Sequence, residues 1–304
     1  MTSFGLIELL ESVAPLALAA GLVLHIASTL LRVTAWRNVL AAAHPVARVR
    51  WRTTCGAVLA GEGANALLPV RGGDVLRIFL GHRGVAGSSY ASVTSSLVPD
   101  SLLDVVIGAV LAAFVLRTGA ADGLQAASWA GDPGNAVLVA ACALALSPLV
   151  LLAARRLRRL AGVAEHVKQG VAILGSPRRY VVSVALVQLA AWALRAASVM
   201  FLLRAFGIDA GVTDAAMVLG AGSVAAVLPA APGGLGPKQA LLVWLLAGAA
   251  PPATVVWFGV GSAVLIAFVN VLLGATAIAL TLRCLPWRAR VVMAQPAPAR
   301  VRGD

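Results

Sequence analysis

Long apolar runs, separated by short charged loops, dominate the hydrophobic pattern of the chain. A helix needs roughly 20 apolar residues to cross a bilayer. Five runs meet or approach that length and are predicted to be membrane-spanning helices: residues 4–31, 90–116, 135–153, 180–203 and 253–282.

Two more apolar stretches, residues 53–84 and 212–248, are interrupted near their centres by proline and paired glycines. Each stretch is predicted to form two short helices. The two helices could be two short spans, or a re-entrant hairpin that leaves the membrane on the side from which it entered. The length of the stretches and their central breaks favour the hairpin.

The charge of the loops assigns the two sides of the membrane. Arginines gather in residues 32–52, 155–179 and 283–302, whereas residues 118–134 carry two aspartates and no lysine or arginine. Basic loops stay in the cytoplasm, so the N-terminus is predicted to lie outside and the C-terminus in the cytoplasm. The number of crossings then requires the first hairpin to enter from the cytoplasm and the second to enter from outside.

The two interrupted stretches also resemble each other. Residues 59–69, LAGEGANALLP, align without gaps with residues 219–229, LGAGSVAAVLP, and paired glycines follow each stretch. The patch DVVIGA from Asp104 has a counterpart, NVLLGA, from Asn270. Small-residue composition alone can produce such matches. The opposite topologies of the two halves nevertheless favour an inverted repeat, which is an architecture of transporters.

The predicted fold class is therefore an all-α integral membrane protein with about five spanning helices and two oppositely oriented re-entrant helical hairpins. We expect one polytopic membrane domain over residues 1–285, followed by a basic cytoplasmic tail, residues 286–304, that is predicted to be disordered. The expected parts of the domain are repeat A, residues 4–117; the connecting span, residues 135–153; a cytoplasmic loop, residues 154–179; and repeat B, residues 180–283.

The composition agrees with this assignment. Hydrophobic residues make up 60% of the chain and charged residues only 12%, against about 25% charged in soluble domains. The net charge of +12 falls mostly in short loops, where it orients the protein and contacts anionic headgroups, so nucleic acid is not an expected partner. The three cysteines and four histidines are scattered without metal-ligand spacing, and we expect neither a metal nor a cofactor.

Charges and a broken backbone at membrane depth are costly, and they persist where protein or a water-filled cavity surrounds them. In the first hairpin the residues concerned are Arg71, Gly72, Gly73, Asp74 and Arg77. Helix N-termini at such a break present donors to an anion, and the two arginines can bind a phosphate. Alternatively, Asp74 is the N-cap of the second short helix, and the arginines pair with nearby aspartates.

Those aspartates are Asp100 and Asp104, which share one face of the helix predicted at residues 90–116. Two carboxylates on one face repel each other unless they are paired or partly protonated. They could pair with Arg71 and Arg77, relay protons, or lie solvated near the membrane surface.

The second hairpin has a lysine at the start of its second helix. A lysine at a helix N-terminus opposes the helix dipole, which favours a functional cation over a lysine that only reaches the outer interface. The candidates from this hairpin are Gly233, Gly234, Gly236, Lys238 and Gln239. Further candidates are Gln188, Trp192 and Arg195 on one face of the span at residues 180–203, together with His25 and Glu62.

Two motifs in the chain resemble a known family. They are LLP-x-R-x-G-D-x-x-R at residues 67–77 and LP-x-x-P-G-G-L-G at residues 228–236, with the acidic pair between them. They are similar to motifs of the flippase-like family that includes the transmembrane region of lysylphosphatidylglycerol synthases, over nearly the whole chain. The resemblance implies a bacterial or archaeal membrane protein linked to movement of phospholipids or lipid-linked glycans between leaflets. By motif it implies functional roles for Arg71, Gly73, Asp74, Arg77, Asp104 and residues 233–236.

The chain departs from the family pattern at two places. Asp100 and Ser101 stand where the family often has Glu-Arg, and Lys238 and Gln239 stand where it often has Arg-Glu. The absence of that second glutamate weakens the case for a carboxylate-driven step on the outer side.

The sequence thus predicts a lipid translocase of the bacterial plasma membrane, not an enzyme, that moves an anionic phospholipid or lipid-linked substrate between leaflets. Arg71, Arg77 and Lys238 would bind the headgroup, while Asp100 and Asp104 would balance or relay charge. Two alternatives stay open. One is a membrane enzyme that acts on a lipid phosphate, and the other is a non-transporting accessory subunit of cell-envelope synthesis that works with a partner protein.

Overall fold

The computed structural model describes residues 13–68, 72–120, 161–225 and 237–284, and every regular element within these ranges is a helix. The predicted all-α fold class is confirmed. The predicted connecting span, residues 135–153, and the tail, residues 286–304, lie outside the described residues.

The elements are α2 (Pro15–Ala43), α3 (Trp51–Leu67), α4 (Gly72–Gly84), α5 (Tyr90–Ser95), α6 (Leu97–Ala120), α8 (Ala161–Gly170), the 3₁₀-helix η2 (Ala172–Gly175), α9 (Pro177–Tyr180), the π-helix η3 (Val181–Ala185), α10 (Leu186–Ala205), α11 (Val212–Ala225), α12 (Pro237–Leu245) and α13 (Pro252–Cys284).

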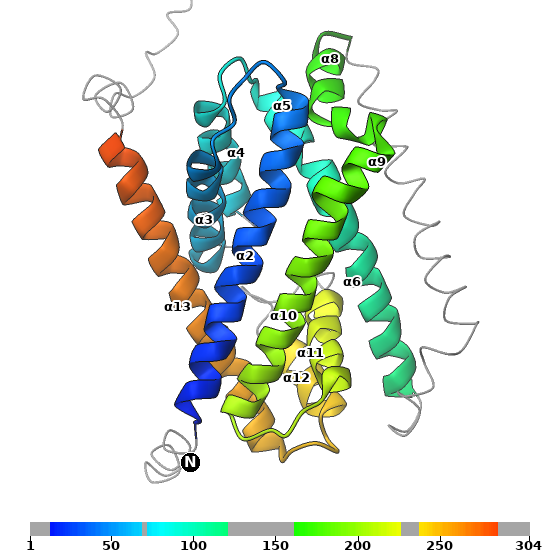
Figure 1. Cartoon of the computed structure of the whole chain (residues 1–304). Helices are drawn as coiled ribbons and strands as arrows, with labels where there is room; N and C mark the ends of the chain where they lie inside the picture. Colours follow the sequence, from blue (N-terminus) through cyan, green and yellow to red (C-terminus); the bar gives the residue numbers. More distant parts are fainter. Residues whose placement is uncertain (1–12, 69–71, 121–160, 226–236, 285–304) are drawn as a thin grey trace, which may run out of the picture.

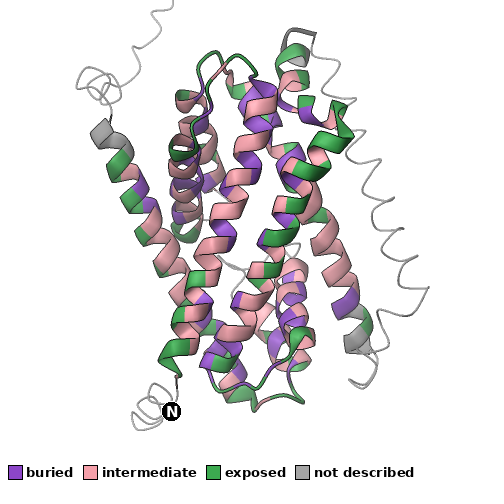
Figure 2. Ribbon diagram, in the orientation of Figure 1, coloured by how far each residue is buried: buried purple, intermediate pink, exposed green. Residues whose placement is uncertain are grey.

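Four described stretches are long and apolar enough to cross a membrane, and they correspond to four of the five predicted spans: Pro15–Ala43, Tyr90–Val115, Pro177–Ala205 and Pro252–Leu280. The protein is therefore a multi-pass membrane protein. Exposed positions run along the length of α13 (Figure 2), as expected of a helix surface that faces lipid. The large apolar side chains among them recur every four residues, at Val256, Val260, Val264, Phe268 and Leu272.

The first spanning helix is longer than the sequence predicts. The pattern predicts an end at residue 31 and a cytoplasmic loop at Arg32, but α2 continues to Ala43. The prediction is wrong at this boundary because the apolar positions continue beyond Arg32, with Trp36 and Leu40 completely buried. Arg32 therefore lies inside a spanning helix.

The short helices form two pairs in opposite halves of the molecule (Figure 1). α3 and α4 lie side by side near the end where α2 finishes, and α11 and α12 lie side by side near the end where α2 begins. The last turn of α3 and the first turn of α4 point toward the middle of the long helices, as do the last turn of α11 and the first turn of α12. This arrangement agrees with two oppositely oriented hairpins. That they are re-entrant in a bilayer stays a prediction.

The contact between α2 and α10 is reciprocal, as a two-fold relation between the halves requires. Ser28 on α2 donates to the carbonyl oxygen of Ala191 at 2.8 Å, and Ser198 on α10 donates to the carbonyl oxygen of Gly21 at 2.7 Å. Ser28 and Ser198 are as far apart in the sequence as Gly21 and Ala191. One register therefore relates the two central helices.

The flanking helices exchange partners in the same way. α3 packs on α13, where Gly63 approaches Gly274, and α11 packs on α6, where Ser223 lies beside Gly108. The sequence alignment pairs Gly63 with Ser223 and Gly274 with Gly108. Equivalent positions thus make equivalent contacts, which supports the predicted inverted repeat.

His44 follows the last residue of α2 and joins it to α5 and α8. Its ring lies 3.3 Å from Ser92 Oγ and 3.1 Å from Gln169 Nε2, and only 4% of the residue is exposed. Burial disfavours the charged ring and lowers the pKa of His44 below its ordinary value.

We expect the protein to lose stability as the pH falls below about 6.5, the ordinary pKa of histidine. In that range the unfolded chain binds a proton at His44 more readily than the folded protein does, so the stabilising effect of the neutral ring is complete above this pH and declines below it. Thermal unfolding at pH 7.5 and pH 5 should therefore differ more for the wild type than for His44→Gln. An equal difference in the two proteins would contradict the assignment.

Candidate functional site

Asn65 caps the start of α4 in the first hairpin. The N–H of Gly73 donates to Asn65 Oδ1 at 2.8 Å, and Asn65 Nδ2 donates to Asp74 Oδ1 at 3.3 Å. Asp74 lies inside the first turn of α4, which begins at Gly72, so its interpretation as the N-cap is wrong. The cap comes instead from the neighbouring helix α3, which no local pattern reveals. The predicted ligand Arg71 lies outside the described residues.

Arg77 of α4 forms a buried ion pair with Asp100 of α6. The Nη2 atom of Arg77 lies 2.7 Å from Asp100 Oδ2, and the two side chains are only 13% and 6% exposed. The guanidinium also lies over the ring of Trp36 on α2, 4.1 Å from its centroid. Of the two predicted roles of Arg77, headgroup ligand or partner of an aspartate, the structure shows the second. The pair holds the first hairpin against α6 and α2.

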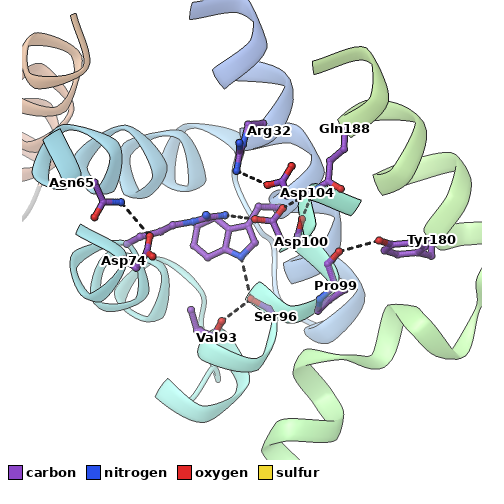
Figure 3. A network of polar contacts seen from close by, with 12 residues as sticks. Arg32, Asn65, Asp74, Val93, Ser96, Pro99, Asp100, Asp104, Tyr180 and Gln188 are labelled. Carbon is purple, nitrogen blue, oxygen red and sulfur yellow. Dashed lines mark hydrogen bonds and ion pairs between the residues drawn. The ribbon is translucent and has the colours of Figure 1, made fainter. Parts of the chain in front are cut away.

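Asp100 and Asp104 each contact α10 as well, so that α6 and α10 are joined at two successive turns. Gln188 Nε2 donates to both the carbonyl oxygen and Oδ1 of Asp100, the latter at 3.2 Å, and Trp192 Nε1 donates to Asp104 Oδ1 at 2.8 Å. Figure 3 shows the network around Asp100 and Gln188. The predicted face of Gln188 and Trp192 therefore meets the predicted acidic face.

The second ion pair joins Asp104 to Arg32, with Arg32 Nη2 2.8 Å from Asp104 Oδ2 (Figure 3). Each aspartate thus has its own arginine, and the repulsion expected between two unpaired carboxylates is relieved. Sequence reasoning missed Arg32 because an arginine at the edge of an apolar run was assigned to a loop. The continuing helical spacing of apolar residues after Arg32 is the signal that could have placed it inside the helix.

These charges lie near the middle of the long helices. Arg32 is eleven residues before Ala43, and Arg195 is ten residues before Ala205, the nearer end of the continuous helical stretch Pro177–Ala205. At 1.5 Å per residue, both positions are about 15 Å from the nearer helix end. That distance is roughly half the thickness of the hydrocarbon core of a bilayer.

Besides Asp74, three further charged groups near these pairs make no ion pair with any residue that the structure describes: Glu62 on α3, Arg195 on α10 and Lys238 on α12. Glu62 lies within electrostatic reach of Arg32 and Arg195. Arg195 lies within reach of Lys238, and its guanidinium is 5.3 Å from the centroid of the Trp192 ring. Arg195 as a residue is exposed and Lys238 is partly exposed.

The other predicted candidates in the second half are placed as follows. Gln239 lies against Gly259 of α13, while Gly233, Gly234 and Gly236 lie outside the described residues.

The predicted candidate His25 of α2 hydrogen-bonds Asn270 of α13, with 3.0 Å between Nε2 and Oδ1. Within the described ranges, no three His, Cys, Asp or Glu side chains gather in a way that could hold a metal ion.

Residues 4–288 match the family model described as "Lysylphosphatidylglycerol synthase TM region". The match covers nearly all of the chain and both hairpins. Neither the curated proteins nor the solved structures contain a match to the chain.

Proposed function

Because the chain belongs to the family of the lysylphosphatidylglycerol synthase transmembrane region, a family of membrane proteins tied to lipid or cell-envelope biosynthesis, we propose that it is a lipid translocase. It would move an anionic phospholipid or a lipid-linked anionic substrate between the leaflets of a bacterial plasma membrane. In this proposal the protein performs no covalent step. The N-terminus lies outside and the C-terminus lies in the cytoplasm.

The observation that carries the proposal is the pair of cations Arg195 and Lys238, which lie near each other and make no ion pair with a carboxylate among the described residues. Glu62 and Asp104 act on Arg195 only from a distance, across from the first repeat. Charges within a membrane protein are costly unless they are paired, and they mark substrate pathways. An anionic headgroup supplies the missing negative charge. In this proposal Lys238 binds the headgroup, as the sequence predicts, and Arg195 binds it as well. Arg77 does not bind the headgroup but stabilises the fold through its ion pair with Asp100.

The two hairpins add a second line of support. Polar groups can cross the hydrocarbon region only where protein or a polar cavity surrounds them. Short helix pairs from opposite halves, whose inner ends point toward the middle (Figure 1), are typical of transporters that bind their substrate between inverted repeats.

We expect Lys238→Ala and Arg195→Ala each to slow lipid translocation by about tenfold or more. Each change removes one charged hydrogen-bond donor from an anion, and such a bond is worth about 1.5–3 kcal/mol; each 1.4 kcal/mol is a factor of ten. The measurement is movement of fluorescent phosphatidylglycerol across liposomes that contain the purified full chain.

Arg204→Ala is the matched control, because Arg204 is an exposed arginine at the far end of the same helix, α10. It should translocate lipid as the wild type does. If the wild-type protein moves no lipid, or if the two interior variants are as active as the control, the proposed function fails.

A further inference from the structure

The second repeat keeps the cation of the first but not its carboxylates. The packing of the short helices fixes the correspondence. Gly81 of α4 lies against Val93 of α5, and Leu242 of α12 lies against Gly259 of α13. Gly81 therefore corresponds to Leu242, and Val93 corresponds to Gly259. Gly81 and Leu242 are as far apart in the sequence as the two glycine pairs are. Val93 and Gly259 are as far apart as the DVVIGA and NVLLGA patches are.

In this register Lys238 takes the position of Arg77, and Ile266 takes the position of Asp100. In the first repeat these two positions hold the buried 2.7 Å ion pair. In the second repeat the acidic position is filled by Ile266, a partly buried apolar side chain that packs against the core of Leu242 and Phe258. Lys238 has thus lost the partner that the repeat provides for its equivalent.

The second acidic position is neutral as well, because Asn270 takes the place of Asp104. The cations, in contrast, are kept in number, since Arg195 is gained where Leu202 takes the place of Arg32. By the register of α2 and α10, Arg195 takes the place of His25, so an arginine replaces a histidine that hydrogen-bonds Asn270.

The local charge around Lys238 is therefore positive. The charged residue that acts on Lys238 is Arg195, which is another cation. Glu62 and Asp104 act on Arg195 and on Arg32, and both acids lie in the first repeat, on α3 and α6. In the first repeat the Asp100 carboxylate neutralises the cation. In the second repeat the equivalent position has no carboxylate, so an anion that is not part of the protein could bind there.

We propose that a phosphate group occupies, in the second repeat, the place that the Asp100 carboxylate fills in the first, beside Ile266 and in reach of Lys238 and Arg195. This inference rests on the proposed function and names the part of the substrate that binds. A tetrahedral phosphate can accept hydrogen bonds from an arginine and a lysine at once. The phosphate can belong to a lipid headgroup or to free inorganic phosphate, and the two sources are separated by experiment.

The test is to give the second repeat the missing carboxylate. Ile266→Asp should pair with Lys238 as Asp100 pairs with Arg77, and so exclude the phosphate. Ile266→Asn is the matched control, because it has the same size and polarity without the charge. Binding of phosphatidylglycerol to the purified full chain, followed by native mass spectrometry, should weaken by about tenfold or more in the first variant and remain within about threefold of the wild type in the second.

Two probes identify the group that binds. Diacylglycerol, which lacks the phosphate, should not compete with phosphatidylglycerol, and a diacylglycerol that competes equally well would overturn the proposal. Inorganic phosphate at millimolar concentration should compete if the phosphate alone is recognised. If it does not compete while phosphatidylglycerol binding still depends on residue 266, the site takes the phosphate only as part of a lipid.

A second variant keeps the proposal testable if Ile266→Asp does not fold. Lys238→Met has a similar length and no charge, and it should also weaken phosphatidylglycerol binding by about tenfold. Wild-type binding in Ile266→Asp or in Lys238→Met overturns the inference. If the wild type binds the lipid, loses it in these variants, and yet translocates no lipid in liposomes, the phosphate site stands and the proposed transport function fails.

Discussion

Replacing Asp100 with alanine is expected to lower the free energy of unfolding by about 3–5 kcal/mol, the usual cost of leaving one partner of a buried ion pair alone. The remaining guanidinium of Arg77 is only 13% exposed, so little water can replace the lost carboxylate. The Gln188 side chain would also lose one of its two acceptors. Unfolding of the purified protein in mixed micelles, followed by tryptophan fluorescence, measures the change.

Two controls separate a buried ion pair from a general effect of removing an acid. In the double variant Arg77→Met/Asp100→Leu both charges are absent, and most of the lost stability should return, because well-packed apolar pairs often replace buried ion pairs without loss. Glu165→Ala removes one partner of the exposed pair with Lys168, whose side chains are 67% and 84% exposed, and should change stability by less than about 1 kcal/mol. If Asp100→Ala is as mild as Glu165→Ala, the ion pair does not hold the hairpin.

The positions of the short helices follow closely from the sequence. Residues 53–84 are predicted to form two short helices with a break near the centre, and the structure has Trp51–Leu67 and Gly72–Gly84. The prediction succeeds because proline and paired glycines act locally, by removing donors and freeing the backbone. Charge in the loops sets the opposite orientation of the second hairpin in the same local way.

The partners of the charged side chains could not be predicted in full. The sequence indicates that Asp100 and Asp104 share a face, and that Gln188 and Trp192 share another, since both pairs have helical spacing. It does not show that the two faces meet, because that depends on how α6 packs beside α10. The sequence also assigns Arg32 to a loop. Hydropathy treats every arginine as a polar residue, and it does not register that Asp104 neutralises the charge of Arg32 inside the helix.

The sequence left open whether the likeness of the two interrupted stretches reflects an inverted repeat or only their small-residue composition. A match in small residues alone carries little information. The reciprocal hydrogen bonds of Ser28 and Ser198 supply what composition cannot, because they require equivalent positions to make equivalent contacts. The equivalence of the two repeats also draws attention to Ile266, whose side chain has no reactive or charged group. Ile266 matters because an aspartate stands at the equivalent position.

Replacing Gly73 with alanine is expected to destabilise the first hairpin by about 3 kcal/mol or more, at the upper end of the cost of overpacking. A Cβ atom at this position would overlap the carbonyl oxygen of Gly61 and lie 2.6 Å from the backbone nitrogen of Asn65. Both obstacles are backbone atoms of α3, so no side chain can turn aside. The two helices would have to separate, which would also break the cap from Gly73 to Asn65.

The neighbouring glycine makes a matched control for that prediction. The three atoms nearest to a Cβ at Gly72 all belong to the side chain of Leu68, the nearest at 3.1 Å. That side chain can turn aside, so Gly72→Ala should change stability by less than about 1 kcal/mol. Lipid translocation should follow the same order, lost in Gly73→Ala and retained in Gly72→Ala, because separating α4 from α3 also moves Arg77 away from Asp100. If the two variants unfold alike, the close approach at Gly73 is not what shapes the hairpin. The glycine pair would then serve only as a helix break, and the two glycines would be interchangeable.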